Sequence, residues 1–237
     1  MEQEVGHLPV MLEEVILALS PHPGSFQIDA TVGGGGHAVR ILEAATPGGR
    51  LLGIDADARA IERSTRRLAP YGERAIVRQA NFESIADVAT DNGFDAVDGI
   101  LMDLGLSSHQ LDDDDRGFSF RSHDELDMRF DTRVGIPASE VVASYSEAEL
   151  ADVFKRHGED PHARRIARAI VAERERKPIE TPAQLADVVT RATPRPKSTR
   201  RRRIHPATRV FQALRIEVNR ELETLPTALE SAVDLLK

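Results

Sequence analysis

The chain of 237 residues contains no cysteine. Disulfide scaffolds, thiolate metal sites and cysteine nucleophiles are therefore excluded. No run of about 18 apolar residues is present, so we expect no membrane span and no membrane partner. The first residues, MEQEVGHLPVML, lack the basic segment and apolar run of a signal peptide, and we expect a cytoplasmic protein. The eight histidines form no HExxH motif or other matched ligand spacing, so no metal site is expected.

Acidic residues outnumber basic residues over the whole chain, but both kinds are clustered locally. The formal net charge of −8 argues against a nucleic-acid partner. However, four consecutive acidic residues occupy positions 112–115, and four consecutive arginines occupy positions 200–203, shortly after Arg195 and Lys197. A global sum hides such local patches. The basic run therefore keeps an anionic partner open.

The first hundred residues alternate between segments typical of strands and segments typical of helices. Strands are predicted over 25–32, 50–54, 75–79 and 96–102, and helices around 12–19 and over 37–45, 57–68 and 83–90. Short strands separated by helices predict a parallel sheet with helices on both faces. The predicted fold class is therefore α/β, with a mostly parallel, doubly wound sheet.

The pattern changes after Asp103. Residues 112–135 are polar and acidic without a clear period. Two capping boxes, SEAE at Ser146 and TPAQ at Thr181, predict helix starts, and a charged helix is predicted over 163–176. A long amphipathic helix is predicted from about residue 206, with one face formed by Val210, Phe211, Leu214, Val218 and Leu222. We therefore predict a helical insertion over 115–205 and an α/β core over 1–114 and 206–237.

The stretch DATVGGGGH, residues 29–37, follows the first predicted strand. In doubly wound sheets a glycine turn at this place lets a ligand approach the backbone, and the next helix presents its amides. Asp55 ends the segment LLGID, twenty residues after Gly35, where an acidic residue can bind ribose hydroxyls. The spacing predicts a site for a nucleoside-containing cofactor. The alternative is a glycine-rich turn beside a surface aspartate.

The glycine pattern alone does not identify the cofactor. The residues Gly33, Gly35 and Ala38 also satisfy a loose dinucleotide fingerprint, whereas a phosphate-binding loop of the Walker type is excluded. Asp29, which could meet a ligand ammonium group, and the polar segment DLGLSS at 103–108 favour S-adenosylmethionine. A nicotinamide-dependent oxidoreductase and a non-catalytic RNA-binding fragment remain as alternatives.

Seven motifs occur in one order along the chain: HLPVMLEEV, DATVGGGGH, GIDADARAI, GILMDLGLSSHQLDDDDRGFSF, LDMRFD, RRIARAIV and HPATRVFQALRIEVNREL. Together they resemble the ribosomal RNA small subunit methyltransferase H family, also called MraW. The resemblance implies a class I, Rossmann-like methyltransferase fold with a helical insertion. It also implies methylation of the exocyclic N4 of a cytosine in the decoding region of 16S rRNA, with S-adenosylmethionine as cofactor.

Two departures accompany the resemblance. His109 stands where the family more often has proline. The family pattern normally continues beyond AVDLLK, so we expect the last strands of the sheet to be missing, and the activity of the shorter chain is left open. The implied partner is 16S rRNA in the small ribosomal subunit or a late precursor, and a homodimer is left open.

The resemblance also implies roles for individual residues. The cofactor would be held by the glycine loop, by Asp55 at the ribose, by an aromatic ring near the adenine and by two residues at the methionine end, namely Gly35, Gly36, His37, Asp55, Phe82, Asp103 and Gln110. The insertion would recognise RNA, and the residues expected to contact phosphate are Arg195, Lys197, Arg200, Arg201, Arg202 and Arg203.

The expected chemistry needs a hydrogen-bond acceptor for the attacking amine. The N4 nitrogen of cytosine is a poor nucleophile because its lone pair is delocalised into the ring. Asp103 is the candidate that accepts this hydrogen bond, with help from Ser107 or Ser108. A role for Asp103 as a cofactor ligand only is the alternative. The target base must be single-stranded or flipped out of its stack.

Overall fold

The computed structural model describes residues 9–107, 110, 114–194 and 205–237. Its contacts divide the chain into two compact units, which are described separately. The first comprises residues 1–105 and 222–237, and the second comprises residues 106–221. We call them the sheet unit and the helical unit.

The sheet unit is built on a parallel sheet whose strand order is β3-β2-β1-β4. Neighbouring strands pair in parallel register, with Ile28 of the central strand opposite Leu52 and Ile100. The prediction of a parallel α/β fold is confirmed, and each strand lies within about three residues of its predicted bounds. The strands are β1 (Phe26–Asp29), β2 (Arg50–Asp55), β3 (Ala75–Gln79) and β4 (Gly99–Leu101).

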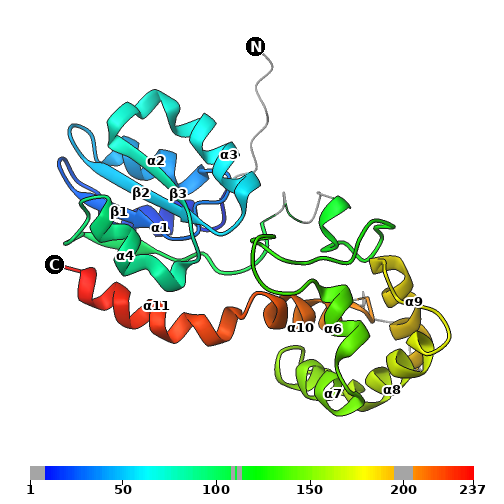
Figure 1. Cartoon of the computed structure of the whole chain (residues 1–237). Helices are drawn as coiled ribbons and strands as arrows, with labels where there is room; N and C mark the ends of the chain where they lie inside the picture. Colours follow the sequence, from blue (N-terminus) through cyan, green and yellow to red (C-terminus); the bar gives the residue numbers. More distant parts are fainter. Residues whose placement is uncertain (1–8, 108–109, 111–113, 195–204) are drawn as a thin grey trace. The chain divides into compact units, whose positions relative to one another are not determined.

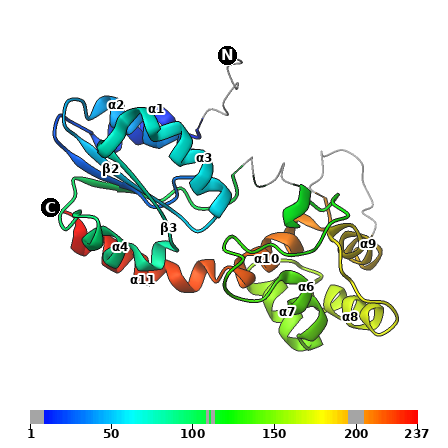
Figure 2. The same ribbon diagram turned by 45° about the horizontal axis from the view of Figure 1, so that its top comes forward.

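Helices cover both faces of this sheet (Figures 1 and 2). One face packs against α1 (Leu12–Leu19), α2 (Gly36–Ala44) and α3 (Ala58–Leu68), and the other against α4 (Ile85–Asp91) and α11 (Glu221–Leu235). Alternate strand residues supply the two cores, so Leu51 faces the first group of helices and Leu52 faces the second. Two 3₁₀ segments, η1 (Ala69–Arg74) and η2 (Phe82–Ser84), flank β3.

The helical unit surrounds a separate apolar core. Its elements are η3 (Asp114–Arg116), α6 (Ala138–Ser144), α7 (Glu147–Arg156), α8 (Ala163–Arg174), α9 (Pro182–Ala192) and α10 (Thr208–Val218). Both predicted capping boxes are confirmed, because the side chains of Ser146 and Thr181 accept hydrogen bonds from the third residue of each helix. The short helix α6 was not predicted.

The two boundaries of the helical unit, at residues 106 and 221, differ from the predicted boundaries of the insertion at 115 and 205. The helix predicted from residue 206 is two helices, because α10 ends at Val218 and Arg220 adopts a left-handed backbone with φ of 51°. Phe211 and Leu214 of α10 are buried in the core of the helical unit, whereas residues 222–237 belong to the sheet unit, whose core includes Ala232 and Leu235 of α11. Leu222, predicted on the buried face, is 52% exposed.

The end of the chain returns to the sheet. After α11, Leu236 forms an isolated parallel bridge with Val97, just before β4. The ammonium group of Lys237 lies 2.8 Å and 2.9 Å from the two carboxylate oxygens of Asp98. None of the helices in the described part of the chain is long and apolar enough to cross a membrane.

Candidate functional site

The glycine turn between β1 and α2 uses its glycines for two different reasons. Gly33 and Gly35 have φ of 50° and 77°, in the left-handed region that side chains disfavour. A Cβ on Gly36 would instead collide with the ring of Pro9. Part of the glycine content therefore admits the protein's own N-terminal segment, and Gly33 and Gly35 shape the turn.

Asp55, at the end of β2, is tied directly to this turn. One of its carboxylate oxygens accepts a hydrogen bond from the amide of Gly33 at 2.9 Å, and the other accepts one from the amide of Asp57 at 2.9 Å. The carbonyl of Asp55 accepts a hydrogen bond from Ala80, after β3, at 3.0 Å. Phe82 follows two residues later and is half-buried against the core. The structure thus brings the glycine turn, Asp55 and the Phe82 segment together.

Asp29, Asp55 and Asp103 lie at or just beyond the carboxyl ends of three neighbouring strands, and we call them the carboxylate trio. Thr31 links two of them, because its amide donates to the Asp29 carboxylate at 3.2 Å and its hydroxyl accepts from the Asp103 amide at 2.7 Å. Asp29 is 1% exposed. The Asp103 side chain is exposed. The trio therefore combines a buried acid with one open to solvent.

Burial dominates the electrostatics of the trio. Loss of hydration, together with the nearby charges of Asp55 and Asp103, raises the pKa of Asp29 to about 7, against the opposing hydrogen bond from Thr31. Burial likewise raises the pKa of Asp55 to about 6, despite its two backbone hydrogen bonds. Carboxylates that repel one another and lack water favour a cationic ligand.

This donor set fits the expected cofactor. S-adenosylmethionine carries a sulfonium, an ammonium group and ribose hydroxyls, and the trio offers negative charge and acceptors for all three. Asp55 can accept ribose hydroxyls in addition to its two amides, since each carboxylate oxygen has two lone pairs. The turn at Gly33 and Gly35 leaves the backbone without side chains beside these acids.

Replacement of Asp29 by asparagine should change how stability depends on pH. The pKa of Asp29 is raised from 3.8 to about 7, so between these values the folded state holds a proton that the unfolded state has lost. The stabilising contribution of this group is therefore full below about pH 4 and is lost as pH rises towards about 7. Relative to Asp29→Asn, the unbound wild-type protein should lose stability between about pH 4 and 7, as measured by urea unfolding.

Titrating groups that do not interact with Asp29 cancel in that difference, because both proteins share them, whereas Asp55 and Asp103 are coupled to it. Asparagine also keeps an oxygen that can accept the Thr31 amide, so the hydrogen bond is preserved. A stability difference that stays constant over this pH range would contradict the burial of a protonated Asp29.

The remaining predicted site residues are placed as follows. His37 is buried in α2, and its Nε2 lies 3.0 Å from the carbonyl of Val10. Ser107 and Gln110 belong to the helical unit and bond to each other, with the Ser107 amide donating to the Gln110 side chain at 3.1 Å. The remaining predicted residues, Ser108, Arg195, Lys197, Arg200, Arg201, Arg202 and Arg203, lie outside the described residues.

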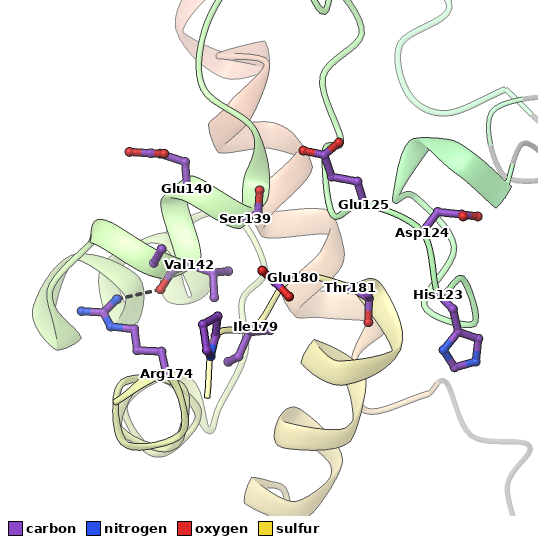
Figure 3. Close-up of a pocket in the computed structure, with 12 residues that line it drawn as sticks. His123, Asp124, Glu125, Ser139, Glu140, Val142, Arg174, Ile179, Glu180 and Thr181 are labelled. Carbon is purple, nitrogen blue, oxygen red and sulfur yellow. Dashed lines mark hydrogen bonds between the residues drawn. The ribbon is translucent and has the colours of Figure 1, made fainter. Parts of the chain in front are cut away.

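A cavity of about 650 Å³ opens in the helical unit, between α6, α8 and the segments before α9 (Figure 3). Four carboxylates line it: Asp124, Glu125, Glu140 and Glu180. The Arg174 guanidinium, also in the wall, donates to the carbonyl of Val142 at 2.7 Å, as Figure 3 marks. None of the described residues predicted for a site lines the cavity, and its acidic wall disfavours phosphate.

Thr31 was missed by the sequence reasoning, and Asp29 was noted as a possible partner of a ligand ammonium group but was not among the predicted site residues. The available signal was the segment DAT at the end of a buried strand, where polar residues have to be hydrogen-bonded. Only the parallel pairing of β1 with β4 places Thr31 next to Asp103, 72 residues away.

Comparison with known proteins matches nearly the whole chain to one family. A family model described as the MraW methylase family matches residues 4–237. A protein of Thermomicrobium roseum named "Ribosomal RNA small subunit methyltransferase H" is 52% identical over 98% of this chain and 70% of its own length. A protein of the same name from Geotalea uraniireducens is 51% identical over 98% of this chain and 73% of its own.

Solved structures are less similar. A SAM dependent methyltransferase from Aquifex aeolicus aligns with 31% of this chain and 39% of its own, with 15% identity and a TM-score of 0.28. Such a partial likeness does not bear on the function of this chain.

Proposed function

Because the chain belongs to the MraW methylase family, we propose that it methylates the exocyclic N4 of a cytosine in the decoding region of 16S rRNA. Family membership establishes a methyltransferase with a class I, Rossmann-like fold, and S-adenosylmethionine is its cofactor. The same membership removes the nicotinamide-dependent oxidoreductase from consideration. The rRNA named for the relatives supports the proposed substrate.

The observation that carries the proposal is the carboxylate trio beside the glycine turn. The cofactor, when bound, supplies an electrophilic methyl group on a cationic sulfur. The protein then has to orient the reactants and stabilise charge that develops on the amine. In this proposal Gly35, Gly36 and Asp55 hold the nucleoside, and Phe82 lies near the adenine.

Asp103 has the properties of an acceptor for the substrate amine. Its side chain is exposed, so a substrate can reach it, while its backbone is held by the Thr31 hydroxyl at 2.7 Å. A carboxylate that accepts a hydrogen bond from the amine localises the nitrogen lone pair and attracts the proton that is lost. The roles that the resemblance implies for Ser107 or Ser108 in catalysis, and for His37 and Gln110 in cofactor binding, are part of this proposal.

Transfer of a tritiated methyl group tests the proposed function. The purified protein and labelled S-adenosylmethionine are incubated either with small ribosomal subunits or with naked 16S rRNA. We expect label in rRNA, located on cytosine N4 after digestion to nucleosides. A protein that binds either RNA without transferring label would be the non-catalytic alternative, and label at another atom would refute the cytosine N4 assignment.

Neutralising the arginine run should reduce the salt dependence of RNA binding. Each phosphate contact with a single strand contributes about −0.7 to the slope of log affinity against log salt concentration. Replacement of Arg200, Arg201, Arg202 and Arg203 with glutamine should therefore make the slope shallower by up to about 3. Filter binding at several salt concentrations measures the slope, with Arg164→Gln and Arg165→Gln in exposed positions of α8 as a matched control. Equal slopes for the wild type and the four-site variant would exclude contact between this run and phosphate.

A further inference from the structure

Two aromatic rings from distant parts of the sequence are stacked on the helical unit. The rings of Phe120 and His205 have centroids 4.4 Å apart and planes within 6° of parallel. Phe120 is partly exposed and His205 is exposed. Phe118, two residues earlier, is instead buried and stacks on Phe130 with centroids 5.6 Å apart. The segment thus sends one aromatic ring into the core and keeps the other near the surface.

Each ring of the stacked pair makes one further contact that holds it in place. The edge of Phe211, a buried residue of α10, meets Phe120 at a ring distance of 6.0 Å and an angle of 89°. The amide of Ala207 donates to Nδ1 of His205 at 3.2 Å, which fixes the orientation of the imidazole at the start of α10. One face of the imidazole lies on Phe120, so the opposite face and the ring edges point away from that partner.

A fixed and exposed aromatic ring is suited to stacking with a nucleobase. Proteins that bind single-stranded nucleic acid combine such rings with positive charge, and stacking tolerates any base because every base has a π face. Arg121, which is exposed, directly follows Phe120, and the arginine run at 200–203 precedes His205 in the sequence. A ring whose orientation is already fixed loses little conformational freedom when a base is added.

We propose that His205, supported from behind by Phe120, is a stacking platform for an unpaired base of the RNA substrate. This inference rests on the proposed function, since it gives the helical unit a means of holding single-stranded rRNA. The base would lie on the imidazole face opposite Phe120, and so extend the pair to a stack of three rings. The contact would be insensitive to base identity and largely insensitive to salt.

The probe is an oligouridine that carries one 2-aminopurine, whose fluorescence falls when it stacks on an aromatic ring. Uridines stack weakly on one another, so quenching on addition of the protein reports stacking on the protein. The wild type should bind this RNA and quench the fluorescence. A wild type that leaves the fluorescence unchanged, or does not bind the RNA, would overturn the platform.

Two substitutions at His205 separate stacking from helix capping. His205→Asn removes the ring but keeps an acceptor near the position of Nδ1 for the Ala207 amide, whereas His205→Phe keeps a ring and removes that acceptor. We expect His205→Asn to abolish quenching and weaken binding by about 5- to 150-fold, the typical effect of losing one base-stacking contact. His205→Phe should retain both quenching and RNA binding, although its melting temperature should fall because the acceptor for the Ala207 amide is lost.

The opposite pattern, with quenching kept in His205→Asn and lost in His205→Phe, would make His205 a capping residue and overturn the proposal. Loss of quenching in both variants would show that quenching depends on an imidazole nitrogen rather than on the ring face, and would also overturn the proposal. The loss in His205→Asn should also leave the salt slope unchanged, unlike neutralisation of the arginine run. Methyl transfer by the wild type to small ribosomal subunits is measured in parallel, so the platform can fail while the proposed function stands.

Discussion

Replacement of Asp103 is expected to slow methyl transfer far more than it weakens cofactor binding. A positioned acid or base typically contributes about 10²- to 10⁴-fold to a rate. Asp103→Asn keeps a hydrogen-bond acceptor but removes the negative charge, so we expect its loss in kcat to be near the lower limit. Asp103→Ala removes both the acceptor and the charge, so we expect its loss in kcat to be near the upper limit. Single-turnover methyl transfer and calorimetric titration with S-adenosylmethionine measure the two effects separately.

The structure provides a reason for this separation. The backbone amide of Asp103 is held by the Thr31 hydroxyl at 2.7 Å, so truncation of the side chain leaves the anchoring contact of the chain intact. Asp91→Asn, at the exposed end of α4, is a matched control for the loss of one negative charge in the sheet unit. If affinity is lost while the rate at saturating cofactor persists, Asp103 is a cofactor ligand and the catalytic role is wrong.

Asp55→Asn should show the reverse behaviour, with weak cofactor binding and a stable fold. A hydrogen bond to a charged group is worth about 1.5–3 kcal/mol, so the loss of two such bonds to ribose hydroxyls should weaken binding by about 100-fold or more. Stability should fall less than binding, because asparagine keeps one oxygen for the amide of Gly33 or Asp57 and loses the other hydrogen bond. Removal of a buried charge, whose pKa is raised to about 6, offsets part of that loss.

Calorimetry and urea unfolding of the same preparation distinguish these effects. Asp91→Asn again serves as the control for net charge. S-adenosylhomocysteine should lose affinity for Asp55→Asn by a similar factor, since both compounds carry the same ribose. Unchanged binding of both compounds would place the ribose away from Asp55 and remove the basis for the nucleoside site.

Much of the local structure was predictable because its causes are local. The strand at 75–79 was predicted with its observed bounds, and the capping boxes at Ser146 and Thr181 form as expected. A hydroxyl three residues before Glu or Gln satisfies free helix amides without help from the rest of the chain. The spacing from Gly35 to Asp55 likewise indicated a joined site, and the hydrogen bond from Gly33 to Asp55 joins them.

The less regular parts were not predictable in this way. The helix α6 has seven residues and follows a polar stretch, so its period is too short to detect. Val210, Phe211 and Leu214 correctly indicated an amphipathic helix, but periodicity reveals only that a face is buried and not which core buries it. The prediction assigned residues from 206 onward to the α/β core, whereas the contacts of α10 place it in the helical unit.

The sequence by itself determined the parallel α/β sheet, the glycine turn, the acid at the end of β2 and the family to which the chain belongs. The tertiary structure alone decided that Thr31 links Asp29 to Asp103, that the charges of Asp55 and Asp103 act on Asp29, and that Phe120 stacks on His205, 85 positions further along the chain. Local propensities act over a few residues, whereas these contacts depend on strand order and core packing, which bring together residues that no short pattern relates.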